Sequence, residues 1–218
     1  MRQAIITIGL AVLYFSSMPV QAEQIKIGLT GQIDLVMDSY NLLESKIHKD
    51  DLITGFYIYD LSIPDSNPQD FASLYVYTNS PNGMSLSVGG ITFQTNPNDV
   101  LFTILLSDYG FDAPLDAYHI TSYHNSSLTN NLRVDNIDWY LFDNTGNALS
   151  SPILSNIPPE LSLWQDNAFM ISGSDIPLPP EKSQGFQVNG HITSVYLIPE
   201  PATLLLLGIG GFLLGKRK

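Results

Sequence analysis

The sequence predicts an all-β protein, an antiparallel β-sandwich or jelly-roll-like single domain, flanked by an N-terminal signal helix and a C-terminal transmembrane helix. Three observations predict this fold class. Short runs rich in β-branched and aromatic residues recur along the chain, polar turn residues separate them at regular intervals, and no long segment between the two ends has a helical period. A length of 218 residues suits one such domain with accessory segments.

The first 22 residues have the composition of an export signal. Arg2 provides a positive start, an apolar run follows over residues 4–15, and small or modest side chains lead up to Ala22. This order is typical of a signal peptide, so we expect signal peptidase to cleave between Ala22 and Glu23. The predicted domains are therefore a signal peptide at 1–22, a β-sandwich domain at 23–198 and a sorting segment at 199–218.

The body is predicted to consist of short strands joined by polar turns. We expect strands within residues 23–33, 53–61, 73–79, 84–96, 99–108, 116–124, 136–143, 167–173 and 186–198. Gly89-Gly90 indicates a hairpin, and residues 144–147 indicate a turn. The nearly continuous apolar run at 99–108 favours a central strand covered on both faces. Residues 158–164 favour a short helical turn, because prolines precede an acidic residue there.

The last twenty residues have three parts in a fixed order. They are Pro199, Glu200 and Pro201, then the uncharged run 202–215, and then Lys216, Arg217 and Lys218. A helix over 202–215 would be about 21 Å long, shorter than a hydrocarbon core of about 30 Å. The terminal basic residues are expected to stay in the cytoplasm, which leaves the acidic body outside.

This tail resembles the PEP-CTERM sorting signal of Gram-negative bacteria. The resemblance implies that exosortase, a membrane-embedded processing enzyme, recognises the tail, removes it and passes the protein to the cell surface or exopolysaccharide matrix. It also implies an inner-membrane intermediate with the body outside the cytoplasm. Residues 54–68 and 141–164 are similar to regions of other exported PEP-CTERM proteins, which mostly lack an assigned activity. An ordinary tail anchor is the alternative.

The charge of the body excludes some classes of partner. Between Glu23 and Pro201 the chain has five basic and 21 acidic residues, a net charge of −16. Such a field repels phosphate backbones, so we expect no nucleic-acid partner. The chain has no cysteine, which excludes disulfides, thiolate metal sites and a cysteine nucleophile.

Catalysis has little support in the sequence, and we expect no enzyme and no catalytic residue. The four histidines are His48, His119, His124 and His191. His119 and His124 are expected on opposite faces of one strand, where they cannot bind one ion. No G-x-S-x-G motif is present. Asp135 with Asp138, or Asp108 with Asp112, are the carboxylate pairs that a glycoside hydrolase would need, but an acidic chain provides such pairs by chance.

We expect no cofactor, with calcium as the open alternative. Calcium prefers several oxygen ligands from loops, and Asp and Asn also favour turns for local reasons. The candidate ligands are Asp65, Asn67, Asp70, Asp108, Asp112 and Asp116, with Asp143 and Asn147 in a further oxygen-rich turn.

Three functions follow from these observations. The first is an exported non-catalytic protein of the cell surface or matrix with a structural or adhesive role. The second is a polysaccharide-binding module, because Tyr57 and Tyr59 alternate with Phe56 and Ile58, and Trp139 precedes Tyr140. Because neighbouring residues of a strand point to opposite faces, one of the two alternating sets is expected on the solvent face of the sheet, where an aromatic side chain can stack on sugar rings. The third is a hydrolase that modifies the matrix.

Overall fold

The computed structural model describes residues 24–67, 69–108, 115–129, 131–175 and 184–199. These residues form strands and one short 3-10 helix: β1 (Gln24–Met37), β2 (Leu52–Asp60), β3 (Ala72–Tyr77), β4 (Gly83–Val88), β5 (Ile91–Gln94), β6 (Phe102–Asp108), β7 (Asp116–Ser122), β8 (Leu132–Asp143), η2 (Leu161–Leu163), β9 (Asp166–Asp175) and β10 (Gly185–Leu197). Within these ranges no helix has the length and apolar character needed to cross a membrane. The expected signal and transmembrane helices lie outside the described residues.

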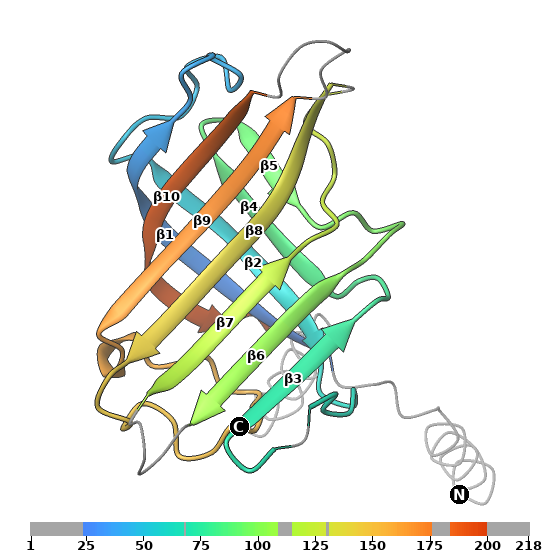
Figure 1. The fold of residues 1–218 in the computed structure, drawn as a ribbon, viewed down its shortest axis with the longest axis vertical. Helices are drawn as coiled ribbons and strands as arrows, with labels where there is room; N and C mark the ends of the chain where they lie inside the picture. The colour runs from blue at the N-terminus through green and yellow to red at the C-terminus, as the bar shows by residue number, and fades with distance from the viewer. Residues whose placement is uncertain (1–23, 68, 109–114, 130, 176–183, 200–218) are drawn as a thin grey trace, which may run out of the picture.

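All ten strands belong to one sheet, in the order β3-β6-β7-β8-β9-β10-β1-β2-β4-β5. Each neighbouring pair is antiparallel. Figure 1 shows that this sheet curls, so that β6 to β9 lie in front of β1, β2, β4 and β5. The all-β prediction is confirmed, whereas the division into the two sheets of a sandwich is not what the described strands show.

The two sides of the curled sheet pack against each other through large aromatic side chains. The hydroxyl groups of Tyr57 on β2 and Tyr118 on β7 are 3.0 Å apart. The Tyr57 ring centroid also lies 6.1 Å from that of Trp139 on β8. Both Tyr57 and Trp139 are fully buried. Because β2 and β7 are far apart in the strand order, these contacts place one continuous core inside the curl.

The expected turns are present. Gly89 and Gly90 have φ values of 58° and 76°, the left-handed conformation that a tight two-residue hairpin requires, and they join β4 to β5. The turn after β8 is also present, with Gly146 at a φ of 66°. The predicted helical turn at 158–164 corresponds to η2.

The prediction that residues 99–108 are covered on both faces is wrong. In β6, Phe102, Ile104 and Leu106 are buried, but Thr103 and Leu105 are only half-buried. β6 is second from one edge of the sheet, and Leu105 faces outwards between Leu74 of β3 and His119 of β7. These neighbours shield Leu105 partly, so an apolar residue is tolerated there without a second covering layer.

The long connection from β8 to β9 closes one end of the core. Leu154 and Trp164 from this segment are buried. The backbone N–H of Leu154 donates to the Tyr75 hydroxyl over 3.2 Å, and the Tyr59 hydroxyl donates to the carbonyl oxygen of Ser155. This connection and the end of β10 lie at the lower end of the molecule in Figure 1.

Candidate functional site

The start of the predicted sorting segment is joined directly to the middle of the sheet. β10 lies between β9 and β1, and Leu197 at its end is opposite Ile27. The backbone N–H of Ile198 donates to the carbonyl oxygen of Lys26 over 2.8 Å. Pro199 follows and has no N–H to continue the ladder. The folded body therefore ends within one residue of the Pro-Glu-Pro sequence.

The beginning of β1 lies at the same end of the sheet, because β1 and β10 are antiparallel. Gln24 is the first described residue and lies next to the predicted cleavage position between Ala22 and Glu23. The two predicted processing positions are thus both attached to one end of one strand pair. Glu200, Pro201 and the basic residues 216–218 lie outside the described residues, as do Ala22 and Glu23.

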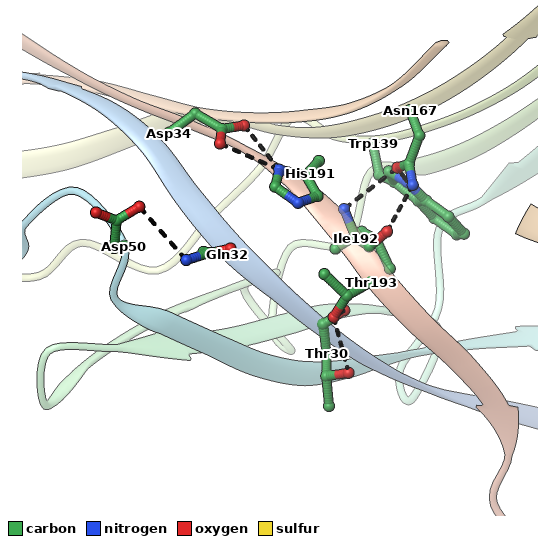
Figure 2. A network of polar contacts seen from close by, with 9 residues as sticks. All are labelled: Thr30, Gln32, Asp34, Asp50, Trp139, Asn167, His191, Ile192 and Thr193. Carbon is green, nitrogen blue, oxygen red and sulfur yellow. Dashed lines mark hydrogen bonds and ion pairs between the residues drawn. The ribbon is translucent and has the colours of Figure 1, made fainter. Parts of the chain in front are cut away.

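The half-buried amide of Asn167 fixes the path of β10 towards this end. The register between β1 and β10 shifts at Thr30/Gly31, so the pairing partner changes from Ser194 to Ile192. Asn167 of β9 spans this irregularity: its amide nitrogen donates to the Ile192 carbonyl over 2.5 Å, and its amide oxygen accepts from the Ile192 N–H over 3.2 Å. The same oxygen accepts the Trp139 indole N–H over 3.1 Å. Figure 2 shows Asn167 between Trp139 and Ile192.

Two rows of side chains cross the outer face of the sheet beside this junction. The first, here called the aromatic row, is set by the register and consists of Tyr196, Gly28, Phe56, Ser85 and Gln94. Gly28 has no side chain because the Tyr196 ring occupies the space that a Cβ atom would need. The Lys26 ammonium lies 3.7 Å from the centroid of the Phe56 ring, a cation–π contact.

The second row, here called the hydroxyl row, consists of Ser194, Thr30, Thr54, Ser87 and Thr92. The hydroxyls of Ser87 and Thr92 are 2.9 Å apart, and those of Thr30 and Thr193 are 3.5 Å apart. Further along β1, Gln32 contacts Asp50 and His191 contacts Asp34, as Figure 2 shows. This face is therefore polar, with apolar side chains gathered in the row nearest the junction.

A groove of about 240 Å³ opens at the Gln94 end of the aromatic row. Phe56, Ile58, Pro81 and Pro97 provide apolar walls, and Asn82 and Gln94 contribute amides. The Asn82 amide nitrogen donates to the Asn79 carbonyl over 3.0 Å, but its oxygen has no hydrogen-bond partner among the described residues. Because a buried acceptor without a donor is unfavourable, a donor from water or a ligand would stabilise this position.

Tyr57 and Tyr59 point into the core, so their rings are not available on the surface to stack on a sugar. Both tyrosines are buried in the core, and burial raises the pKa of each hydroxyl. Phe56 and Ile58 are the half-exposed pair. Trp139 is likewise buried and Tyr140 is exposed. The sequence did not reveal which of the two alternating sets points into the core, since the side chains of both sets are apolar enough to be buried.

The four histidines contact four different aspartates. His191 lies 2.9 Å from Asp34, His124 lies 3.2 Å from Asp99, His119 lies 3.5 Å from Asp138 and His48 lies 3.8 Å from Asp51. His119 also contacts the Thr121 hydroxyl through Nε2 at 3.1 Å, the same nitrogen that faces Asp138. A nucleophile–histidine–acid relay needs the two partners on different ring nitrogens, so this arrangement differs from a triad.

The two carboxylate pairs considered for glycoside hydrolysis are not supported by their contacts. Asp135 lies 2.7 Å from Arg133 and accepts from the Ser174 hydroxyl over 2.9 Å. Asp138 instead contacts His119. Asp108 is described but Asp112 is not, so the second pair lies partly outside the described residues.

Two of the calcium candidates, Asp65 and Asp143, accept hydrogen bonds from backbone N–H groups. Asp65 accepts the N–H groups of Asn67 and Leu74 over 2.9 and 2.8 Å. Burial alone would raise the pKa of Asp65, but hydrogen bonds from Asn67, Leu74 and Ser73 together hold that pKa below its usual value. Asp143 accepts the N–H groups of Thr145 and Asn147, whose backbone hydrogen bonds lower its pKa. No group of three or more His, Cys, Asp or Glu residues that fits a metal ion occurs in the described ranges.

Asp116 is fully buried, as Asp143 is nearly, but Asp116 alone among the described acids has a buried carboxylate oxygen without a hydrogen-bond partner. It lies opposite Asp108 of β6 and Asp143 of β8. Its Oδ2 atom accepts the Leu149 N–H over 2.8 Å, whereas Oδ1 has no partner among the described residues. Burial raises the pKa of Asp116, and the charges of Asp108 and Asp143 raise it further against the hydrogen bonds from Leu149 and Ala148.

The functional residues that the sequence did not reveal are Asn167 and the members of the aromatic row. The aromatic row depends on the pairing of β1 with β10 and β2 with β4, strands that are not consecutive in the chain, whereas the contacts of Asn167 depend on β9 lying between β8 and β10. Gly28 inside an alternating strand was the available signal, since glycine in a strand indicates close approach of another group.

Comparison with known proteins agrees with the geometry of the junction. A family model, the PEP-CTERM protein-sorting motif, matches residues 197–218. Neither the curated proteins nor the solved structures provide a match to this chain. The matched segment starts at Leu197, the last residue of β10. The chain therefore carries a PEP-CTERM protein-sorting motif attached to the central strand of its β-sheet, which is consistent with an exosortase substrate and with export towards the cell surface.

Proposed function

We propose that this protein is an exported, non-catalytic component of the cell surface or exopolysaccharide matrix, with a structural or adhesive role. The observation that carries this proposal is the direct continuation of β10 into the sorting motif at Leu197. A body that ends one residue before Pro199 stays folded when residues beyond that position are removed, because the last hydrogen bond of the ladder is made by Ile198.

The proposed route has two processing steps. Signal peptidase removes residues 1–22, and the uncharged run 202–215 then holds the chain in the inner membrane with the body outside the cytoplasm. Exosortase acts near Pro199, Glu200 and Pro201 and releases the body. The positions of Gln24 and Pro199 at the same end of adjacent strands suit this route, because both processing steps then take place on the side of the body nearest the membrane.

The hydroxyl row supports a structural or adhesive role. Ser194, Thr30, Thr54, Ser87 and Thr92 present uncharged donors and acceptors in a line across five strands. Hydroxyl groups both donate and accept hydrogen bonds, so a row of them can contact a hydrated polymer without requiring a charged partner.

Fractionation of the producing cells tests the proposal. The chain should be found at the cell surface or in the matrix when exosortase is present, and in the inner membrane when the exosortase gene is deleted. The Ile198 ladder predicts that the released body is folded. Equal recovery from the inner membrane of both strains would contradict the proposal in favour of an ordinary tail anchor.

A polysaccharide-binding role is the second candidate, and the groove beside Phe56 favours it. Sugars combine apolar C–H faces with hydroxyl groups, and this groove combines Phe56 and Pro81 with the amides of Asn82 and Gln94. The Asn82 oxygen, which has no hydrogen-bond partner among the described residues, is an acceptor of the kind that a sugar hydroxyl satisfies.

A glycan array followed by titration with the producer's own polysaccharide tests this candidate. Phe56→Ala and Gln94→Ala should weaken binding, while Tyr140→Ala removes an exposed aromatic ring from a different strand and should not. Absence of binding to the producer's polysaccharide by the unaltered protein would rule this candidate out. Release of reducing ends from that polysaccharide would instead favour a hydrolase.

A further inference from the structure

Five exposed apolar side chains lie at the end of the molecule from which the sorting motif leaves, while Leu35, Met37, Tyr40 and Leu52 form a separate exposed group at the opposite end of β1. The first group, the apolar rim, is defined by Ile153, Ile157, Leu163, Tyr196 and Leu197. Ile153 and Ile157 are 72% and 73% exposed, and the other three are between 46% and 48% exposed. They come from two segments, the connection between β8 and β9 and the end of β10, which lie at the same lower end in Figure 1.

The two segments of the apolar rim are held together by direct contacts. η2 contacts β10, and the Tyr59 hydroxyl near the end of β2 donates to the Ser155 carbonyl between Ile153 and Ile157. Tyr59 pairs with Ile25 of β1, the strand that also pairs with Leu197. The apolar rim therefore lies at one end of the folded body, with Tyr196 on the outer face of the sheet beside Gly28 and Leu197 on the opposite face beside Ile27.

Covalent geometry places this surface close to any membrane that holds the uncharged run. Ile198 is fixed to Lys26 by its backbone N–H, and Ala202 begins the run four residues later. Four residues span at most about 14 Å when fully extended. The headgroup layer on each side of a bilayer is roughly 6 Å thick, so the end of the body lies within about 8 Å of its outer surface at full extension.

We propose that the apolar rim rests in the headgroup layer of the membrane while the sorting tail is in place, so that the partner of this surface is a lipid bilayer. This inference depends on the membrane-anchored intermediate of the proposed function. Isoleucine, leucine and tyrosine side chains are favourable at the boundary between headgroups and acyl chains, where tyrosine keeps its hydroxyl in water. Removal of the tail then releases the body, because five partly exposed side chains alone hold it weakly.

The charges around the apolar rim specify the kind of lipid. Asp60, Glu160 and Asp166 are at this end of the strands, while Lys26 is the nearby cation in the described part of the chain. Anionic headgroups would repel these carboxylates. The apolar rim is therefore suited to a zwitterionic surface, and contact should weaken as the fraction of anionic lipid rises.

The absence of cysteine makes a direct test simple, because one introduced cysteine can carry one label. Protein of residues 23–218 with Ile157→Cys, labelled with an environment-sensitive fluorophore, is reconstituted into phosphatidylcholine vesicles that contain nitroxide-labelled lipid. The control is Tyr40→Cys, a 59% exposed position in the connection that leaves the opposite end of β1. Both side chains are largely exposed, so neither change should disturb folding.

The proposal predicts that lipid nitroxides quench the label at position 157 several-fold more than the label at position 40. Ile153→Asp, combined with the label at 157, should reduce that quenching, and so should phosphatidylglycerol in the vesicles. Equal quenching at 157 and 40 would overturn the proposal.

Flotation of the vesicles separates this inference from the proposed function. Protein that floats with the vesicles but shows no preferential quenching at 157 is anchored without contact of the apolar rim, which contradicts this inference alone. Protein that does not float contradicts the membrane-anchored intermediate and therefore both proposals.

Discussion

The backbone N–H of Ile198 donates to the carbonyl oxygen of Lys26 over 2.8 Å, and this bond joins the residue just before the Pro-Glu-Pro sequence to the first strand of the sheet. Because β10 lies between β9 and β1, the sheet has a continuous order only when this strand is in place. The strand that joins the two halves of the sheet therefore also leads into the sorting motif. When the motif is exposed to a processing enzyme, all the strands of the body have already been synthesised.

Asn167 should control the path of β10 towards that junction. Asn167→Asp removes the amide donor to the Ile192 carbonyl, and Asn167→Ala also leaves the Trp139 indole N–H without its acceptor. Loss of a buried hydrogen-bond partner costs about 1–3 kcal/mol, so both variants should lower the free energy of unfolding by that order in urea denaturation.

The matched control for Asn167 is Asn156→Ala, an exposed asparagine in the connection between β8 and β9. It should change the free energy of unfolding by less than about 0.5 kcal/mol. Hydrogen exchange adds a specific readout, since the Ile198 amide should exchange faster in the Asn167 variants. Unchanged unfolding and unchanged exchange would show that Asn167 does not fix β10.

The Tyr57 and Tyr118 hydroxyls should stabilise the core as a pair. Each hydroxyl is the other's partner across the curl at 3.0 Å, and burial raises the pKa of both. Either Tyr57→Phe or Tyr118→Phe leaves one buried hydroxyl unsatisfied, at a cost of about 1–2 kcal/mol. The double variant removes both polar groups and should cost less than the sum of the two single variants. Additive losses in a double-mutant cycle would contradict a direct pair.

Asp116 should make the protein less stable as the pH rises. Burial raises its pKa in the folded protein above the ordinary value of 3.8. The stabilisation that comes from this raised pKa is therefore complete below pH 3.8. It is lost as the pH rises through the pKa of Asp116 in the folded protein. Asp116→Asn keeps an acceptor for the Leu149 N–H without the charge, so this variant should lack that loss and be at least as stable as the unaltered protein at pH 7.

Melting temperatures from pH 3.5 to 7.5 check the prediction for Asp116, with the difference between protein and variant as the readout. Asp116→Ala is the comparison, because it removes the acceptor and should be about 1–3 kcal/mol less stable than Asp116→Asn at every pH. A constant difference between the unaltered protein and Asp116→Asn over this range would contradict a raised pKa.

Much of the strand content could be predicted from the sequence, because alternation and turn residues are local signals. The Gly89-Gly90 hairpin is an example, since only residues that adopt positive φ join strands so tightly. The pairing of β1 with β10, β2 with β4 and β3 with β6 could not be predicted. These partners are distant in the chain. The alternation of apolar and polar residues shows which face of a strand is buried, but not which strand lies beside it.

The candidate site was predictable at one end only. Pro199, Glu200, Pro201 and the basic tip form a linear motif, which is readable without a fold. The orientation of Phe56 and Tyr57 was not readable, because both side chains are apolar enough for a core and the choice depends on Trp139 and Tyr118 across the curl. Asn167 was expected at the start of the strand 167–173, but its contacts with Trp139 and Ile192 depend on β9 lying between β8 and β10.

Intact mass of the mature protein, from hosts with and without exosortase, shows whether the C-terminal tail is removed at the Pro-Glu-Pro sequence. The mature chain should start at Glu23 in both hosts, end at or after Pro199 in the first and keep residues 202–218 in the second. Replacement of Pro199, Glu200 and Pro201 by alanine should leave the tail in place in both. A tail retained in both hosts by the unaltered protein, or a mature end that precedes Ile198, would contradict processing at this motif.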